Sequence, residues 1–219
     1  MLHVNGVQIE GVQNIRAAVF NHFSSHSRHI EVERPGVDNL CFRQLSMIES
    51  GNIIRSFTLE EVKQAVWDCD SYKSPGPDDI SFGFLKQFWN VVKDDFMRFA
   101  TEFHRSGRLP KGINTTFIAL IPRVDSPQRL HDFRPISLVG CMYKVLAKIL
   151  ANRLRAVIRS VVSDSQSAFV KGKQILDGIL VANEVVDEAR RLKKEMLLFK
   201  VDFEKAYDSV DLNYLDMVM

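Results

Sequence analysis

Apolar residues recur at helical spacing along much of the chain. Within residues 13–25, Ile15, Ala18, Val19 and Phe23 fall on one face of a helix. The same spacing predicts further helices over 81–105, 141–162 and 174–192, one that begins at Thr58, and one that starts at Asp211.

The helix that begins at Thr58 has the clearest local signals. Thr58 and Glu61 form a capping box, in which each side chain satisfies a backbone N–H of the other residue. An apolar stripe then follows along one side, made of Leu59, Val62, Ala65, Val66 and Cys69.

Helix-breaking residues indicate where other helices cannot form or must end, and apolar spacing indicates which positions face inward. Two prolines and a glycine within residues 73–79 exclude a helix there. Gly107 and Pro110 are typical of a helix end, so they close the helix over 81–105. In the helix over 141–162 we expect three residues to face inward, namely Val145, Ile149 and Leu154.

Two apolar segments favour strands. Residues 115–121 are β-branched and apolar and end at Pro122. Residues 196–203 have the continuous apolar character of a buried strand. Residues 26–57 show no sustained period and are interpreted as a linker. Together these patterns predict a helix-rich α/β (α+β) fold.

The composition is that of a globular protein. Apolar residues make up 46% and charged residues 26% of the 219 positions, which disfavours disorder, collagen and coiled coils. No apolar run approaches the roughly 18 residues of a membrane span, and the N-terminus lacks a signal-peptide pattern. The three cysteines lie far apart, so we expect no disulfide framework and a reducing, nuclear or cytoplasmic location.

Charge is distributed unevenly along the chain. The net charge is +2, but residues 111–175 contain eleven Lys and Arg against three acids, so this segment carries +8 and the rest −6. Such asymmetry indicates a polyanionic partner, with a solvated basic surface as the alternative.

The sharpest candidate for chemistry is the sequence FKVDFEKAYDSVD at 199–211. Asp202 lies at the end of an apolar strand, where an unpaired buried carboxylate is costly. A divalent metal is a natural partner in phosphate chemistry. A nearby lysine or the N–H groups of a helix start could pair with Asp202 instead, and the local pattern leaves both open.

Other motifs carry little weight. His22, His26 and His29 have a spacing that could place metal ligands on a helix, but no carboxylate or cysteine is close by, which favours a solvated helix end. The sequence has no GxxxxGK[ST], GxGxxG or GxSxG, so P-loop, Rossmann and hydrolase interpretations lack a motif.

Four blocks of the chain resemble, in order and spacing, the reverse transcriptases of LINE-type, non-LTR retrotransposons. They are KSPGPDD at 73–79, ALIPRVDSPQRLHDFRPISLVGCMYKVLAKILANRL at 119–154, DSQSAFVKGKQILDGIL at 164–180 and FKVDFEKAYDSV at 199–210. The resemblance covers about residues 58–219. It implies a right-hand polymerase of which the fingers and a partial palm are present, and therefore an incomplete domain.

The resemblance also divides the chain and implies its partners. Residues 1–57 would be an N-terminal extension or linker, 58–195 the fingers and start of the palm, and 196–219 a partial palm with the first catalytic aspartate. The implied activity is RNA-directed DNA synthesis, with an RNA template, a DNA primer and dNTPs as partners and with Mg²⁺ or Mn²⁺ as cofactor.

Roles for single residues follow from the resemblance. Asp202 would be the catalytic carboxylate that bridges both metals, and the backbone carbonyl of Phe203 would be a further ligand. Lys205 and Ala206 would offer backbone N–H groups to the triphosphate, and Tyr207 would be the steric gate beneath the sugar.

The resemblance implies basic contacts in the fingers as well. Arg123 and Arg134 match positions that grip phosphates, a task that suits forked guanidinium groups. Residues expected near the template are Gln166, Phe169, Lys171 and Lys173. A face formed by Arg153, Arg155 and Arg159 would follow a nucleic-acid backbone, with a solvated face as the alternative.

The sequence departs from the family pattern in four places. Asp79 replaces a glycine, Arg123 a commoner lysine, and Lys173 a commoner arginine. The fourth departure is the absence of an aromatic-Ala-Asp-Asp motif, which carries the remaining catalytic carboxylates. Asp78-Asp79 and Asp94-Asp95 are not substitutes for it.

The missing motif leaves the function open. The helix starting at Asp211 has no cap or breaker before the chain ends, which indicates a truncated domain that is inactive alone. An inactive basic nucleic-acid-binding remnant is the alternative. A Mg²⁺-dependent phosphohydrolase would need further carboxylates around Asp202.

Overall fold

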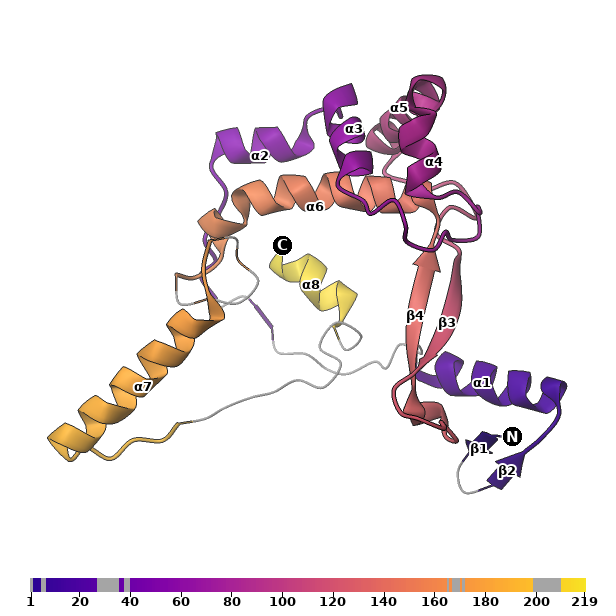
Figure 1. The fold of residues 1–219 in the computed structure, drawn as a ribbon. Helices are drawn as coiled ribbons and strands as arrows, with labels where there is room; N and C mark the ends of the chain where they lie inside the picture. Colours follow the sequence, from indigo (N-terminus) through magenta and orange to yellow (C-terminus); the bar gives the residue numbers. More distant parts are fainter. Residues whose placement is uncertain are drawn as a thin grey trace. The chain divides into compact units, whose positions relative to one another are not determined.

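Helices dominate the computed structural model, which describes residues 2–4, 7–26, 36–37, 40–164, 166, 170, 172–198 and 210–219 (Figure 1). The chain divides into two units. The first comprises Met1–Val32 and Ser56–Leu150, and the second Glu33–Arg55 and Ala151–Met219. Among the described residues, no helix is both long and apolar enough to cross a membrane.

The first unit combines a helical core with two β-hairpins. Its elements are β1 (Leu2–Val4), β2 (Val7–Ile9), α1 (Val12–His26), α3 (Leu59–Trp67), α4 (Phe82–Gln87), α5 (Trp89–Ser106), β3 (Thr116–Pro122), the short 3₁₀ helix η1 (Leu130–Asp132), β4 (Phe133–Val139) and the first half of α6 (Cys141–Val161). The second unit contains α2 (Met47–Ile54), the second half of α6, α7 (Ile175–Leu192) and α8 (Leu212–Val218).

The predicted start of α3 is confirmed in detail. The Thr58 hydroxyl accepts the Glu61 N–H at 3.2 Å, and the Glu61 carboxylate accepts the Thr58 N–H at 3.0 Å. The apolar stripe then buries Val62, Ala65 and Val66 completely. The capping box therefore fixes where the helix starts, and burial of the stripe holds it in place.

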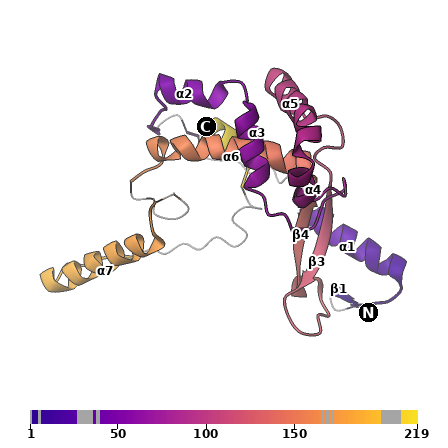
Figure 2. The same cartoon turned by 45° about the horizontal axis from the view of Figure 1, so that its top comes forward.

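The core of the first unit lies where α3, α4 and α5 gather over the first half of α6 (Figures 1 and 2). The predicted helix over 81–105 is two helices, because the backbone of Phe88 leaves the helical region at φ −101° and ψ 22°. Its predicted end is confirmed, since Gly107 closes α5 at φ +64°. The buried core residues are Phe57, Val62, Ala65, Val66, Phe82, Leu85, Trp89, Phe96, Ala100, Cys141, Val145, Leu146 and Ile149.

The inward face of α6 differs from the prediction at one position. Val145 and Ile149 are buried as expected, but Leu154 is 40% exposed. Successive steps of four residues continue the buried ridge from Ile149 to Arg153 and Val157, which are 8% and 6% exposed. Leu154 lies one residue, or about 100°, off that ridge, so it turns toward solvent.

The strands β3 and β4 pair as an antiparallel ribbon from Thr116↔Val139 to Pro122↔Phe133. The sequence patterns predicted β3 but not β4, which contains Pro135. The register explains why Pro135 is tolerated. The Arg123 N–H bonds the Asp132 carbonyl at 2.7 Å, and alternation along the ladder then places Pro135 at a pair without backbone hydrogen bonds, where its missing N–H costs nothing.

The structure contains two further elements that the sequence patterns did not predict. Helix α2 interrupts the predicted linker over 26–57, and Ser46 and Glu49 form a capping box at its start. The β1–β2 hairpin, with three residues in each strand, is too short for a periodic signal. The predicted strand over 196–203 is not seen in its described part, because residues 196–198 form no regular element; 199–203 lie outside the described residues.

The Pro-Gly-Pro turn docks against the junction between β4 and α6. The Asp78 carboxylate accepts the Cys141 N–H at 2.5 Å, which satisfies a free donor at the start of α6. A methyl group on Gly76 would lie 2.5 Å from the Gly140 nitrogen and 2.6 Å from the Val139 oxygen, so only glycine fits. Asp79 adopts φ +53°, a left-handed conformation that glycine tolerates better.

The Cys141 thiol is buried at this junction and has a raised pKa. Burial raises the pKa of the Cys141 thiol to about 12, and its hydrogen bond to Asp78 adds to the shift. Cys141 is 2% exposed, whereas Cys41 is exposed. Cys141 therefore remains a protonated, unreactive thiol in the folded protein.

The raised pKa of Cys141 predicts a loss of stability in alkali. Below about pH 9 the thiol is protonated in both the folded and the unfolded chain; above it the unfolded chain releases the proton first. The free energy of unfolding should therefore fall by about 1–2 kcal/mol more in the parent than in Cys141→Ala between pH 8 and 10.5. Urea titrations followed by Trp67 and Trp89 fluorescence measure this difference. Equal pH dependence in the two proteins would contradict it.

Candidate nucleotide and nucleic-acid contact sites

The β3–β4 ribbon brings Arg123 and Arg134 to one face. Arg134 lies directly opposite Ile121. Arg123 follows β3 by one residue, and its N–H donates to the Asp132 carbonyl, which continues the pairing of the two strands beyond Pro122. Opposed residues and residues two apart share a face of a ribbon, so this pairing assigns both arginines to one side near the tip. Both arginines are exposed. The resemblance matched these two positions to phosphate-gripping residues, and the ribbon makes them neighbours.

The same face also exposes apolar side chains. Phe117 is 57%, Ile121 47% and Ile136 42% exposed, and the register places all three on the side of the two arginines. A phosphate bound to the arginines would therefore lie beside an apolar surface that accepts the flat face of a base or an aromatic ring.

In the loop at the tip of the ribbon, the Asp132 carboxylate bonds backbone N–H groups. The Asp132 carboxylate accepts the N–H groups of Gln128 at 2.9 Å and Arg129 at 2.8 Å. These two hydrogen bonds, first the one from Gln128, lower the pKa of Asp132 below its ordinary value. The carboxylate thus stabilises the loop.

Arg153 is buried and bonds the end of helix α2. The residue is 8% exposed, and one guanidinium nitrogen donates to the backbone carbonyls of Ile53 at 2.7 Å and Arg55 at 2.5 Å. These carbonyls lie at the end of α2, where a helix has unsatisfied acceptors and partial negative charge. A hydrogen bond from Ser160 to Glu49 adds a second link between α2 and α6. The burial of Arg153 is therefore explained without a nucleic acid.

The other two arginines of the expected face are on the surface. Arg155 is exposed and donates to the Asn152 side chain at 3.2 Å, within one turn of α6. Arg159 is also exposed, and its guanidinium lies so close to Gly172 that a side chain there would collide with it. Gly172 adopts φ +79°, a backbone conformation that favours glycine.

The structure brings part of the expected template region together. Arg159 meets the loop that contains Lys173, whose ammonium group donates to the Asp164 carbonyl at 2.6 Å. Gln166 is exposed. Phe169 and Lys171 lie outside the described residues.

The expected catalytic segment lies outside the described residues altogether. This applies to Asp202, Phe203, Lys205, Ala206 and Tyr207. Within the described part of the chain, no group of three or more His, Cys, Asp or Glu side chains gathers in a way that could hold a metal ion.

Comparisons with known proteins give the family. The family profile described as reverse transcriptase (RNA-dependent DNA polymerase) matches residues 121–219, which contain β4, η1 and helices α6 to α8. The chain contains part of a reverse transcriptase domain that is related to the polymerases of non-LTR retrotransposons.

Three relatives illustrate the relationship. The transposon TX1 uncharacterized 149 kDa protein of Xenopus laevis is 34% identical over 158 residues, which are 72% of this chain and 12% of that protein. The Pol polyprotein of the type-1 retrotransposable element R2 of Bradysia coprophila is 27% identical over 70% of this chain and 17% of its own length. The probable RNA-directed DNA polymerase from transposon BS of Drosophila melanogaster is 24% identical over 72% and 18%. The chain thus spans less than a fifth of these relatives.

The different environments of Arg153 and Arg155 predict unequal effects of substitution on stability. Arg153→Ala removes a buried donor from two carbonyls and should lower the free energy of unfolding by about 2–4 kcal/mol. Arg155→Ala should change it by less than about 0.5 kcal/mol. Thermal unfolding followed by circular dichroism tests this pair. Equal losses would show that Arg153 does not anchor α2.

Proposed function

We propose that this chain supplies the fingers and the start of the palm of an RNA-directed DNA polymerase. The ribbon face with Arg123 and Arg134 would bind the triphosphate of an incoming dNTP. The observation that carries the proposal is the pairing of the ribbon, which assigns two exposed arginines to one side near its tip within a reverse transcriptase domain. Two forked cations at neighbouring positions match the charge and the spaced oxygens of a triphosphate.

The catalytic half of the proposal rests on the resemblance. Divalent metal ions serve the family, and here Asp202 and the Phe203 carbonyl would hold them. When bound, the metals would supply charge neutralisation for phosphoryl transfer. Lys205 and Ala206 would orient the triphosphate through their N–H groups, and Tyr207 would exclude a 2′-hydroxyl by its volume.

The template and primer would contact other basic residues. We assign Arg155, Arg159 and Lys173 to the nucleic-acid backbone, together with Gln166, Phe169 and Lys171 of the same block. Support comes from the exposure of Arg155 and Arg159 and from the proximity of Arg159 to the loop of Gly172. Arg153 is left out of this assignment because it is buried against α2.

An inactive nucleic-acid-binding remnant is the second candidate. It is favoured by the charge of +8 over residues 111–175, which attracts a polyanion without any catalytic residue. The two candidates differ in one property, because a remnant needs no specific affinity for a nucleoside triphosphate.

Binding of a fluorescent dTTP analogue to the purified chain with Mg²⁺ tests the proposal. Arg123→Ala and Arg134→Ala should each weaken the affinity by about tenfold, since each removes a charge-assisted hydrogen bond worth about 1.5 kcal/mol. Fluorescence anisotropy gives the dissociation constants, and a single-stranded RNA is titrated in parallel.

Arg98→Ala is the matched control. Arg98 is an exposed arginine on α5 that pairs with Asp95 at 2.5 Å, and its loss should leave dTTP affinity unchanged. RNA binding without measurable dTTP binding would support the remnant. dTTP binding that is unaffected by either ribbon substitution would remove the arginines from the nucleotide site.

A further inference from the structure

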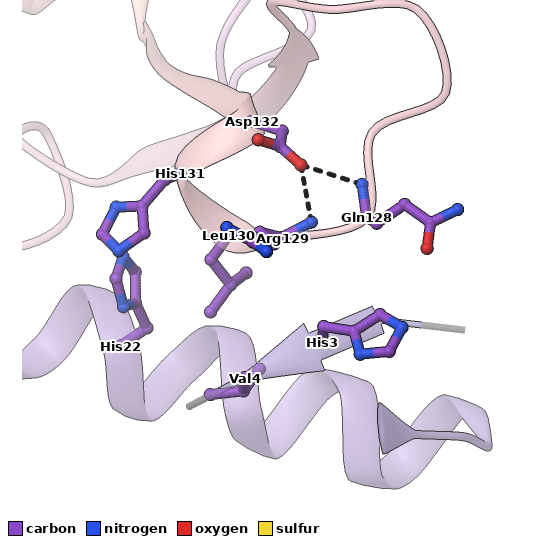
Figure 3. Close-up of a pocket in the computed structure, with 8 residues that line it drawn as sticks. All are labelled: His3, Val4, His22, Gln128, Arg129, Leu130, His131 and Asp132. Carbon is purple, nitrogen blue, oxygen red and sulfur yellow. Dashed lines mark hydrogen bonds between the residues drawn. The ribbon is translucent and has the colours of Figure 1, made fainter. Parts of the chain in front are cut away.

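A cavity of about 760 Å³ lies where the N-terminal elements meet the loop at the tip of the ribbon (Figure 3). The His3 N–H donates to the Gln128 carbonyl at 2.7 Å, and His3 forms a parallel bridge with Arg129, so backbone contacts join β1 to this loop. The lining residues are His3, Val4, His22, Gln128, Arg129, Leu130, His131 and Asp132.

The lining is rich in hydrogen-bond donors. His3 comes from β1, His22 from α1 and His131 from η1, and Arg129 lies at the start of the same short helix. The imidazole rings of His22 and His131 lie next to each other, with centroids 5.3 Å apart and planes at 82° (Figure 3). Leu130, which is 4% exposed, provides an apolar wall.

The single acid of the lining is already engaged. Asp132 accepts the backbone N–H groups of Gln128 and Arg129 (Figure 3). The remaining polar groups are three imidazoles, a guanidinium and an amide. An arginine with histidines is the donor set of an oxyanion site, because each of these side chains can give N–H groups to an anion.

We propose that this cavity binds a phosphate oxyanion. Metal binding by the histidines is not favoured, because the described residues contain no group of three side chains placed to hold a metal. The cavity adjoins the phosphate-binding face of the ribbon, since the Arg123 N–H donates to the Asp132 carbonyl at 2.7 Å. The site uses different side chains from that face and stands independently of the proposed function.

The phosphate can come from two sources, a nucleic-acid backbone or a free phosphate such as that of a nucleotide. A nucleic acid would extend out of the cavity over its exposed rim, which includes Gln128. A free phosphate would be held only by the imidazoles and the guanidinium inside it. The same donors would recognise the phosphate from either source. The two sources differ in whether RNA competes with inorganic phosphate for the cavity.

The test uses residues 1–219 with two probes, inorganic phosphate and a single-stranded RNA 12-mer, at pH 6 and pH 8. Isothermal titration gives the affinities of the parent and of the triple variant His22→Phe, Arg129→Gln, His131→Phe. The phenylalanines keep the contact between the two rings while they remove the donors. We expect phosphate binding to be at least tenfold weaker in the variant than in the parent at both pH values, because three side chains that donate N–H groups are lost.

Controls separate a binding effect from a folding effect. Arg98→Gln, which removes an exposed arginine on α5, should retain parental affinity for both probes. Arg129→Gln with His131→Gln changes only exposed residues and serves if the triple variant fails to fold.

A fall in RNA affinity together with competition by phosphate identifies a nucleic-acid backbone as the source. A fall in phosphate affinity alone identifies a free phosphate. Phosphate and RNA affinities that match the parent in both variants would overturn the proposal.

Discussion

One hydrogen bond, from the Cys141 N–H to the Asp78 carboxylate, connects the helical core to the strands that carry the candidate nucleotide site. It is 2.5 Å long and joins residues 63 positions apart. The donor is one of the N–H groups that every helix leaves unsatisfied at its start, and a carboxylate there also meets the positive end of the helix dipole. Gly76 allows the turn to approach the backbone of Val139 and Gly140 closely.

This contact determines how the ribbon leaves the core. β4 ends at Val139 and α6 begins at Cys141, so a single residue, Gly140, separates the arginine-bearing strand from the helix. With the junction fixed, the position of Arg134 relative to the core depends on the ribbon alone. The KSPGPDD block is therefore a structural clamp for the candidate site, a role that the sequence resemblance did not assign to it.

Patterns of spacing predicted the elements whose stability is local. The capping box of Thr58, the glycine end at Gly107 and the amphipathic stripe of α6 each depend on residues within a few turns. β4 was missed because its stability depends on pairing with β3, which alone shows that Pro135 falls at a harmless position. Helix α2 could have been predicted from Ser46 and Glu49, but it is short and its apolar residues Met47, Ile48 and Ile54 are exposed.

The candidate sites also combine residues that the sequence selected with an arrangement that only the structure shows. The resemblance selected Arg123 and Arg134 one by one, while their common face follows from the register. Helical spacing alone does not distinguish Arg153 from Arg155, because the difference comes from the carbonyls of α2, about 100 residues away in the chain. The histidine cavity gave no sequence signal, since His3, His22 and His131 meet only through tertiary contacts.

Hydrogen exchange at the start of α6 tests the central claim most directly. Amide protection is measured by mass spectrometry in the parent, in Asp78→Ala, and in Asp79→Asn as a control in the same turn. If Asp78 clamps the junction, Asp78→Ala should accelerate exchange in β4 and the first turn of α6 by at least tenfold, while α7 and the Asp79→Asn protein keep parental rates. Unchanged protection of β4 and α6 in Asp78→Ala would contradict the account.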